Sequence, residues 1–184
     1  MLYHLLVPFS DQYAVFNVFK YLTFRTGGAV LTSLVVCFFF GPKIIRWLKH
    51  KQADGQPIRN DGPARHLIQK QGTPTMGGML ILLSIGAGTL LWSDLSNHYV
   101  WITLLVTFGF GIIGLIDDYL KVIHSDHYGL SVIVKIVFEF IVAVIAIIWL
   151  VNVFPNSLTT SLALPFFKDL LIPLGIMFVP FASF

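Results

Sequence analysis

Charged residues are scarce in this sequence. They make up 11% of its 184 residues, whereas 56% are hydrophobic and the mean hydropathy is +0.80. A soluble domain is typically about 25% charged. The composition therefore excludes a soluble globular domain and predicts an integral membrane protein whose surroundings are the lipid bilayer, and we expect no nucleic-acid partner.

Cysteine is almost absent as well. Cys37 is the single cysteine, so no disulfide can form within the chain, and its position inside an apolar run predicts an inert side chain that faces lipid or a neighbouring helix. The sequence also lacks a short basic leader with a small-residue cleavage site, so we expect no removable signal peptide. Internal repeats and low-complexity tracts are not evident.

Long apolar runs are what the sequence has instead. A helix needs about 20 apolar residues to cross a hydrocarbon core of about 30 Å. The runs predict an all-α, polytopic integral membrane protein with four complete transmembrane helices and a truncated fifth, all in one domain. We place these segments at Gly27–Leu48, Thr75–Trp92, Trp101–Tyr119, Ser131–Val153 and Asp169–Phe184.

The distribution of charge predicts the orientation of these segments. Most Lys and Arg residues lie at the end of the first span and in the loop 49–74, whereas the other side of that span offers only Lys20 and Arg25. By the positive-inside rule the loop is cytoplasmic and the N-terminus is outside. Alternation of the spans then makes the loop 117–130 cytoplasmic too. Residues 1–25 mix aromatic and charged side chains, which is typical of a segment in the membrane interface.

An acidic pair closes the third apolar run. Asp117 and Asp118 are adjacent, and Lys121 follows. Two carboxylates can hold Mg²⁺, which prefers oxygen ligands and often bridges a protein to substrate phosphates. On the predicted topology the pair shares a face with the basic loop, which suits phosphoryl transfer beside a lipid surface. The alternative is that the acids merely end the helix at the interface.

Other readings of these residues stay open. A transporter would use the acids as a cation site, although the interiors of the spans are almost uncharged. A non-catalytic membrane scaffold is a third alternative.

Lys135 and Glu139 are spaced i, i+4 and can simply pair with each other. Thr75 is a suitable N-cap for the second span after Pro74. The histidines show no paired metal-ligand spacing, so we assign no zinc.

Three stretches together resemble a known family: Arg59–Pro63 (RNDGP), Gly72–Gly78 (GTPTMGG) and Asp117–Lys121 (DDYLK). On this hydropathy profile they are similar to the phospho-N-acetylmuramoyl-pentapeptide-transferases, a branch of the polyprenyl-phosphate N-acetylhexosamine-1-phosphate transferases. The acidic pair is shared across the superfamily, and the GTPTMGG stretch indicates the branch. The resemblance extends over essentially the whole chain.

The resemblance implies a reaction and a place for it. The family transfers phospho-MurNAc-pentapeptide from UDP-MurNAc-pentapeptide to undecaprenyl phosphate, with Mg²⁺, at the cytoplasmic face of the bacterial inner membrane, giving lipid I and UMP for peptidoglycan synthesis. It implies that Asp117 and Asp118 are catalytic and bind the metal, Asp117 as base or as nucleophile. It also implies substrate-binding roles, which fall on Lys70, Thr75, Lys121 and Lys135. A homodimer is left open.

The sequence also departs from the family. The family has more helices, and its later cytoplasmic loops carry an Asn/Asp-rich motif, a further metal-binding Asp and a His cluster that this chain does not contain. The final stretch, Phe178–Phe184, is unlike the expected continuation of its helix, with Pro180 inside it. We therefore expect the 184-residue chain to be inactive alone.

Overall fold

The computed structural model describes residues 1–52, 76–124, 129–154, 160–164 and 167–183. The predictions for the loop 49–74 from residue 53 onward, with Lys70, and for Thr75 fall outside the described residues.

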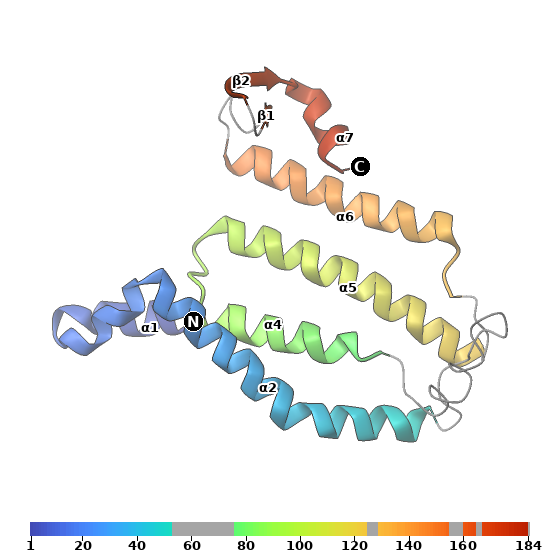
Figure 1. The fold of residues 1–184 in the computed structure, drawn as a ribbon, viewed down its shortest axis with the longest axis horizontal. Coiled ribbons are helices and arrows are strands. Elements are labelled where there is room, and N and C mark those ends of the chain that lie inside the picture. Colours follow the sequence, from blue (N-terminus) through green and yellow to red (C-terminus); the bar gives the residue numbers. More distant parts are fainter. Residues whose placement is uncertain (53–75, 125–128, 155–159, 165–166, 184) are drawn as a thin grey trace.

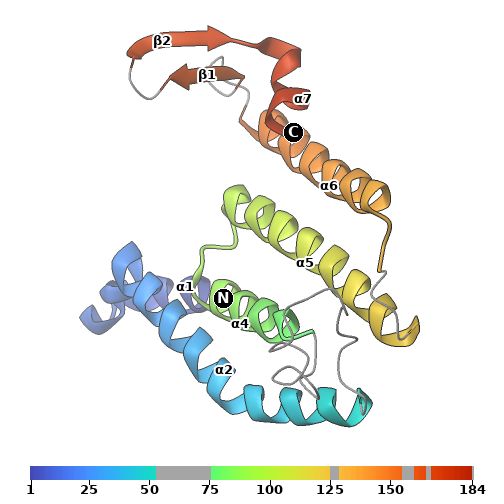
Figure 2. The same cartoon turned by 45° about the vertical axis from the view of Figure 1, so that its right-hand side comes forward.

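Four apolar helices form a single layer: α2 (Leu22–Lys51), α4 (Gly78–Trp92), α5 (His98–His124) and α6 (Val132–Val153). They lie side by side in chain order and alternate in direction (Figures 1 and 2), and the main contacts join consecutive helices. Three of them, α2, α5 and α6, are long and apolar enough to cross a membrane. The predicted all-α, polytopic architecture is confirmed.

The helix ends differ from the apolar runs. α2 begins at Leu22 rather than Gly27, and α5 extends from His98 to His124 rather than from Trp101 to Tyr119. Hydropathy marks only the apolar part of a helix, whereas backbone hydrogen bonds continue into its polar ends. α4 is the short member, since 15 residues span only about 22 Å at 1.5 Å per residue.

A proline interrupts α2. Pro42 lies inside the helix, where it lacks the N–H for one helical hydrogen bond and its ring clashes with the preceding turn. Figures 1 and 2 show α2 changing direction in its second half, the half that contains Pro42. The kink predicted from the sequence is therefore present.

Small residues hold α2 against α4. A Cβ atom added at Gly88 would lie 2.8 Å from the Ala29 carbonyl oxygen, so the two backbones almost touch there. Beside this contact the Ser33 hydroxyl donates to the Ser84 carbonyl at 2.9 Å, and the Cys37 Sγ lies 3.0 Å from the Ser84 Oγ. Close approach and interhelical hydrogen bonds are the usual sources of helix association in lipid. Cys37 thus faces a neighbouring helix.

The N-terminal segment lies across one end of the layer. It consists of α1 (Leu2–Leu6), η1 (Val7–Asp11) and η2 (Ala14–Lys20), near the connection between α4 and α5 (Figure 1). The Phe19 ring stacks on the Trp92 ring with 5.8 Å between centroids. The aromatic side chains thus attach this segment to the helices, and its position in the membrane interface stays a prediction.

The C-terminal part is not wholly helical. β1 (Ser161–Leu164) and β2 (Phe167–Pro173) form an antiparallel hairpin, and η3 (Gly175–Met177) leads into α7 (Phe178–Ser183), which packs on α6. The expected fifth apolar segment therefore begins as a strand, and only its last part is helical. Periodicity does not distinguish a short apolar strand from a helix, and pairing with β1 decides the outcome.

Candidate active site

Asp117 is the central residue of the candidate site. It lies within α5, seven residues before the helix ends at His124, and its side chain is only 12% exposed. Its Oδ2 accepts a hydrogen bond from the Lys121 Nζ at 2.6 Å, and its Oδ1 accepts one from the Leu130 backbone N–H at 2.8 Å. The helical i, i+4 spacing brings Lys121 to Asp117, whereas Leu130 comes from the start of the next helix.

The residues just before α6 leave space for the Asp117 carboxylate. A Cβ atom at Gly129 would lie 2.9 Å from both the Asp117 Cγ and the Asp117 carbonyl oxygen, so only glycine permits this approach. Ser131 then caps α6 by accepting from the Val134 N–H at 3.4 Å. The positive end of the α6 dipole therefore lies beside Asp117 and favours its charged form.

Asp118 is the more accessible member of the pair. Its side chain is 36% exposed, and the Lys121 Nζ lies 3.8 Å from its Oδ1. Adjacent residues project about 100° apart around a helix, so the two carboxylates point in different directions and Lys121 lies between them. A single cation can thus be within reach of both acids.

The donor set is compatible with Mg²⁺. Within the described residues, no further Asp, Glu, His or Cys joins the pair to make a group of three. Mg²⁺ is often held by one or two carboxylates while water and substrate phosphates complete its shell. Asp117 and Asp118 would supply those carboxylates, provided that Lys121 leaves the Asp117 Oδ2.

Lys135 adds a second cation from α6. It is half-buried and lies close enough to Asp117 for the two opposite charges to attract each other. In the part of the chain that the structure describes, no ion pair joins Lys135 to Glu139, so the simple i, i+4 pair is not formed. The structure therefore brings together four of the six predicted site residues: Asp117, Asp118, Lys121 and Lys135.

Gly129 and the Leu130 amide were missed by sequence reasoning. Their only sequence signal is their place just before the N-cap of α6, and a backbone N–H has no residue type by which a motif could mark it. The contact depends on α5 and α6 lying antiparallel and in contact. Only the packing of the two helices reveals it.

The start of α4 lies at the same end of the layer as the C-terminal end of α5 (Figure 1), the part of α5 that contains the acidic pair. The Leu82 side chain packs into the space left by Gly111 of α5, 2.5 Å from the position of an added Cβ. Gly111 and Asp118 are seven residues apart, so they lie on the same side of α5. At the entry to α4, Met76 adopts a φ of 72°, a left-handed conformation that is uncommon for residues with a side chain.

Together, the layer of apolar helices and the acid–lysine cluster at one end define a polytopic membrane protein with a candidate phosphate-handling site. Residues 70–82 match the family model described as phospho-N-acetylmuramoyl-pentapeptide-transferase signature 1. The chain is 52% identical over 178 residues to a phospho-N-acetylmuramoyl-pentapeptide-transferase of Granulibacter bethesdensis, covering 97% of the chain and 49% of that protein. It is 50% identical over 186 residues to the transferase of the same name from Maricaulis maris, covering 98% of the chain and 51% of that protein. The chain matches these phospho-N-acetylmuramoyl-pentapeptide-transferases along nearly its whole length and spans about half the length of each of these curated relatives.

Proposed function

We propose that the chain takes part in the transfer of phospho-MurNAc-pentapeptide from UDP-MurNAc-pentapeptide to undecaprenyl phosphate. An oxygen of the lipid phosphate forms a bond to the β-phosphorus of the nucleotide sugar, the bond from that phosphorus to the bridging oxygen breaks, and UMP leaves. The products are lipid I and UMP. We place the reaction at the cytoplasmic face of the bacterial inner membrane, where the basic residues of α2 and the acidic pair share one end of the layer.

One observation carries this proposal: Asp117 accepts hydrogen bonds from both Lys121 and the Leu130 amide, and its helix packs against α4, whose first residues, 78–82, fall within the signature match. Phosphoryl transfer depends mostly on positioning and on neutralising charge. Lys121 and Lys135 supply positive charge for the phosphates, and the α6 N-terminus adds its dipole. Bound Mg²⁺ would neutralise phosphate charge at Asp117 and Asp118. Lys70 and Thr75 are proposed substrate contacts.

Two reaction routes are possible for Asp117. As a base it takes the proton of the lipid phosphate, and as a nucleophile it attacks the β-phosphorus itself and forms a phospho-aspartate. Both routes require Lys121 to release the Asp117 Oδ2. Rapid-quench detection of a phospho-aspartate supports the second route, and inversion of configuration at phosphorus excludes it.

The test of the proposed function is a substitution in a complete transferase. Residues 1–184 replace the region that they match in the Maricaulis maris relative, and the release of UMP and the formation of lipid I are measured in membranes. Asp117→Asn should lower the rate by about 100-fold or more, the range expected for loss of a general base. Asp11→Asn removes an exposed carboxylate at the opposite end and should leave the rate unchanged. Unchanged lipid I synthesis with Asp117→Asn would count against the catalytic role.

The isolated chain is a separate question. We propose that the 184-residue chain alone has no transferase turnover, since the family's later loops carry further motifs. Turnover by the purified chain with both substrates and Mg²⁺ would refute this.

A homodimer stays a prediction, which the mass of the chain in detergent would decide.

A further inference from the structure

A second polar site lies at the end of the layer opposite Asp117. Arg25 of α2 and Asp94 of the connection between α4 and α5 both line a cavity of about 270 Å³. Thr26, Thr89, Trp92, Ser93 and Asn97 are the other lining residues with polar side-chain atoms. Its residues come from α2, α4, the connection and α5, and none of them belongs to the acid–lysine cluster.

Arg25 brings an unused donor to this cavity. Within the described residues its guanidinium makes no hydrogen bond or ion pair, and its Nε is buried without an acceptor. The guanidinium lies over the Tyr3 ring, whose centroid is 4.6 Å from the Arg25 Cζ. Buried polar groups are nearly always hydrogen-bonded, so an orphaned group indicates a missing partner.

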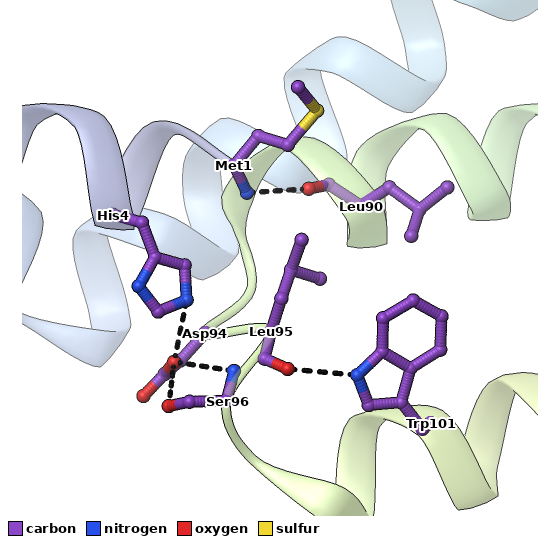
Figure 3. Close-up of polar contacts among 7 residues, drawn as sticks. All are labelled: Met1, His4, Leu90, Asp94, Leu95, Ser96 and Trp101. Atoms are coloured by element: carbon purple, nitrogen blue, oxygen red, sulfur yellow. Dashed lines mark hydrogen bonds and ion pairs between the residues drawn. The ribbon is translucent and has the colours of Figure 1, made fainter.

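Asp94 brings an unused acceptor. Its Oδ1 accepts from the Ser96 N–H at 3.0 Å and the Ser96 Oγ at 2.6 Å, and the His4 Nε2 lies 3.1 Å away. Figure 3 shows these contacts converging on one oxygen while the other points away. Among the described residues, Oδ2 makes no hydrogen bond or ion pair, and no ion pair joins Asp94 to Arg25 although both line the cavity.

The site lies where a bilayer surface is expected. Tyr99, Trp92 and Trp101 gather at this end of the helices, and the Trp101 Nε1 donates to the Leu95 carbonyl at 2.8 Å. Trp and Tyr are enriched at the boundary between hydrocarbon and water. The N-terminal amine is already used, since Met1 donates to the Leu90 carbonyl at 2.8 Å (Figure 3).

We propose that this cavity binds the phosphoethanolamine headgroup of a phospholipid. Its phosphate accepts hydrogen bonds from the Arg25 guanidinium, and its primary ammonium donates to the Asp94 Oδ2. The ligand must carry both charges, because Asp94 repels a bare phosphate. A choline headgroup has no N–H to donate, and a glycerol headgroup has no positive charge for Asp94.

The direct test offers the purified 184-residue chain an equimolar mixture of phosphatidylethanolamine, phosphatidylcholine and phosphatidylglycerol in detergent, and identifies the retained lipid by native mass spectrometry. Phosphatidylethanolamine should be retained about tenfold over each of the others, and excess inorganic phosphate should not displace it. Tenfold corresponds to about 1.4 kcal/mol. Equal retention of the three lipids, or displacement by inorganic phosphate, would overturn the proposal.

Variants locate the binding. Arg25→Gln and Asp94→Asn should each abolish the preference for phosphatidylethanolamine. His4→Gln leaves the Asp94 Oδ2 in place and should retain it. Lys20→Gln is the matched control, because it removes a basic residue of the N-terminal segment outside the cavity. Preserved preference in Arg25→Gln would contradict the site. Circular dichroism checks the fold, and if Arg25→Gln does not fold, the lipid series on the unsubstituted chain still decides.

Discussion

Asp117 is fixed by partners that reach it from two directions. Lys121 comes from its own helix, and the Leu130 amide comes from the entry to α6. The first contact follows from i, i+4 spacing, while the second requires that no side chain intervene at Gly129. The geometry of the carboxylate therefore depends on a residue that has no functional group.

We expect Gly129→Ala to disturb the site. The new methyl group would meet the Asp117 carboxylate and carbonyl, and such overpacking typically destabilises by about 1–3 kcal/mol. The melting temperature in detergent should fall, and transfer by the complete chimera should fall at least as strongly as with a comparably destabilised variant elsewhere. Gly114→Ala is the control, since nothing lies within 4 Å of a Cβ there and alanine favours a helix. Equal melting temperatures for the two variants would contradict the proposed contact.

The environment of Asp94 predicts that stability at the other end of the molecule depends on pH. The hydrogen bond from the Ser96 hydroxyl, aided by the charges of His4 and Arg25, holds the pKa of Asp94 below its ordinary value of 3.8, against the opposing effect of burial. Because the pKa is lower in the folded chain, this stabilisation is fully present above about pH 4 to 5 and is lost as the pH falls through the folded value. A partly exposed pair of this kind contributes roughly 0.2–1 kcal/mol.

The consequence is measurable as hydrogen exchange in residues 2–20, whose His4 is tied to Asp94. Exchange protection there should fall between about pH 5 and pH 3, beyond the intrinsic change of exchange rate. Asp94→Asn should lower the protection already at pH 7 and flatten its pH dependence. Asp11→Asn, which removes a 91% exposed carboxylate, should behave like the unsubstituted chain. An unaltered pH profile in Asp94→Asn would refute the assignment.

The pairing of α2 with α4 is the principal feature at the scale of elements. α4 is too short to span a typical bilayer unaided, and it packs along α2 through Gly88 and Ser84. Its contact with α5 uses Gly86 and Gly111, which receive Phe108 and Leu82 respectively. α4 therefore sets the distance between α2 and α5.

Gly88→Ala should push α2 away from α4. The added Cβ would lie 2.8 Å from the Ala29 carbonyl oxygen, a backbone atom that cannot rotate aside. We expect a loss of stability of about 1–3 kcal/mol, measured by thermal denaturation in detergent. Gly27→Ala lies on α2, where nothing is within 4 Å of an added Cβ, and should be neutral or stabilising. A Gly88→Ala variant as stable as Gly27→Ala would show that the helices are not in close contact.

At the scale of the whole molecule, the two ends of the single layer carry different groups of polar residues. The C-terminal ends of α2 and α5 lie together with the start of α4 and of α6, while the N-terminal segment lies at the other end (Figure 1). Basic residues of α2 and the acidic pair thus share one end. We propose that this end faces the cytoplasm.

Thiol labelling tests this arrangement. Cys37→Ala removes the single cysteine, and new cysteines are placed at Lys49, Ile123 or Asn152, which are all exposed. A membrane-impermeant reagent added outside should label Asn152→Cys, while Lys49→Cys and Ile123→Cys should react after the membrane is opened. Labelling of Lys49→Cys and Ile123→Cys from opposite sides would disprove a shared end.

The sequence by itself determined the membrane class, the four helical segments, the kink at Pro42 and the residues that bear charge, because hydropathy and side-chain chemistry are local properties. The family signature could be recognised from the sequence for the same reason. Tertiary structure alone decided that α5 continues beyond Tyr119 to His124, that residues 167–173 pair as a strand, and that Gly129 and the Leu130 amide lie against the Asp117 carboxylate. These features depend on which backbone segments come into contact. A contact between segments distant in the chain cannot be predicted from the local sequence of either segment.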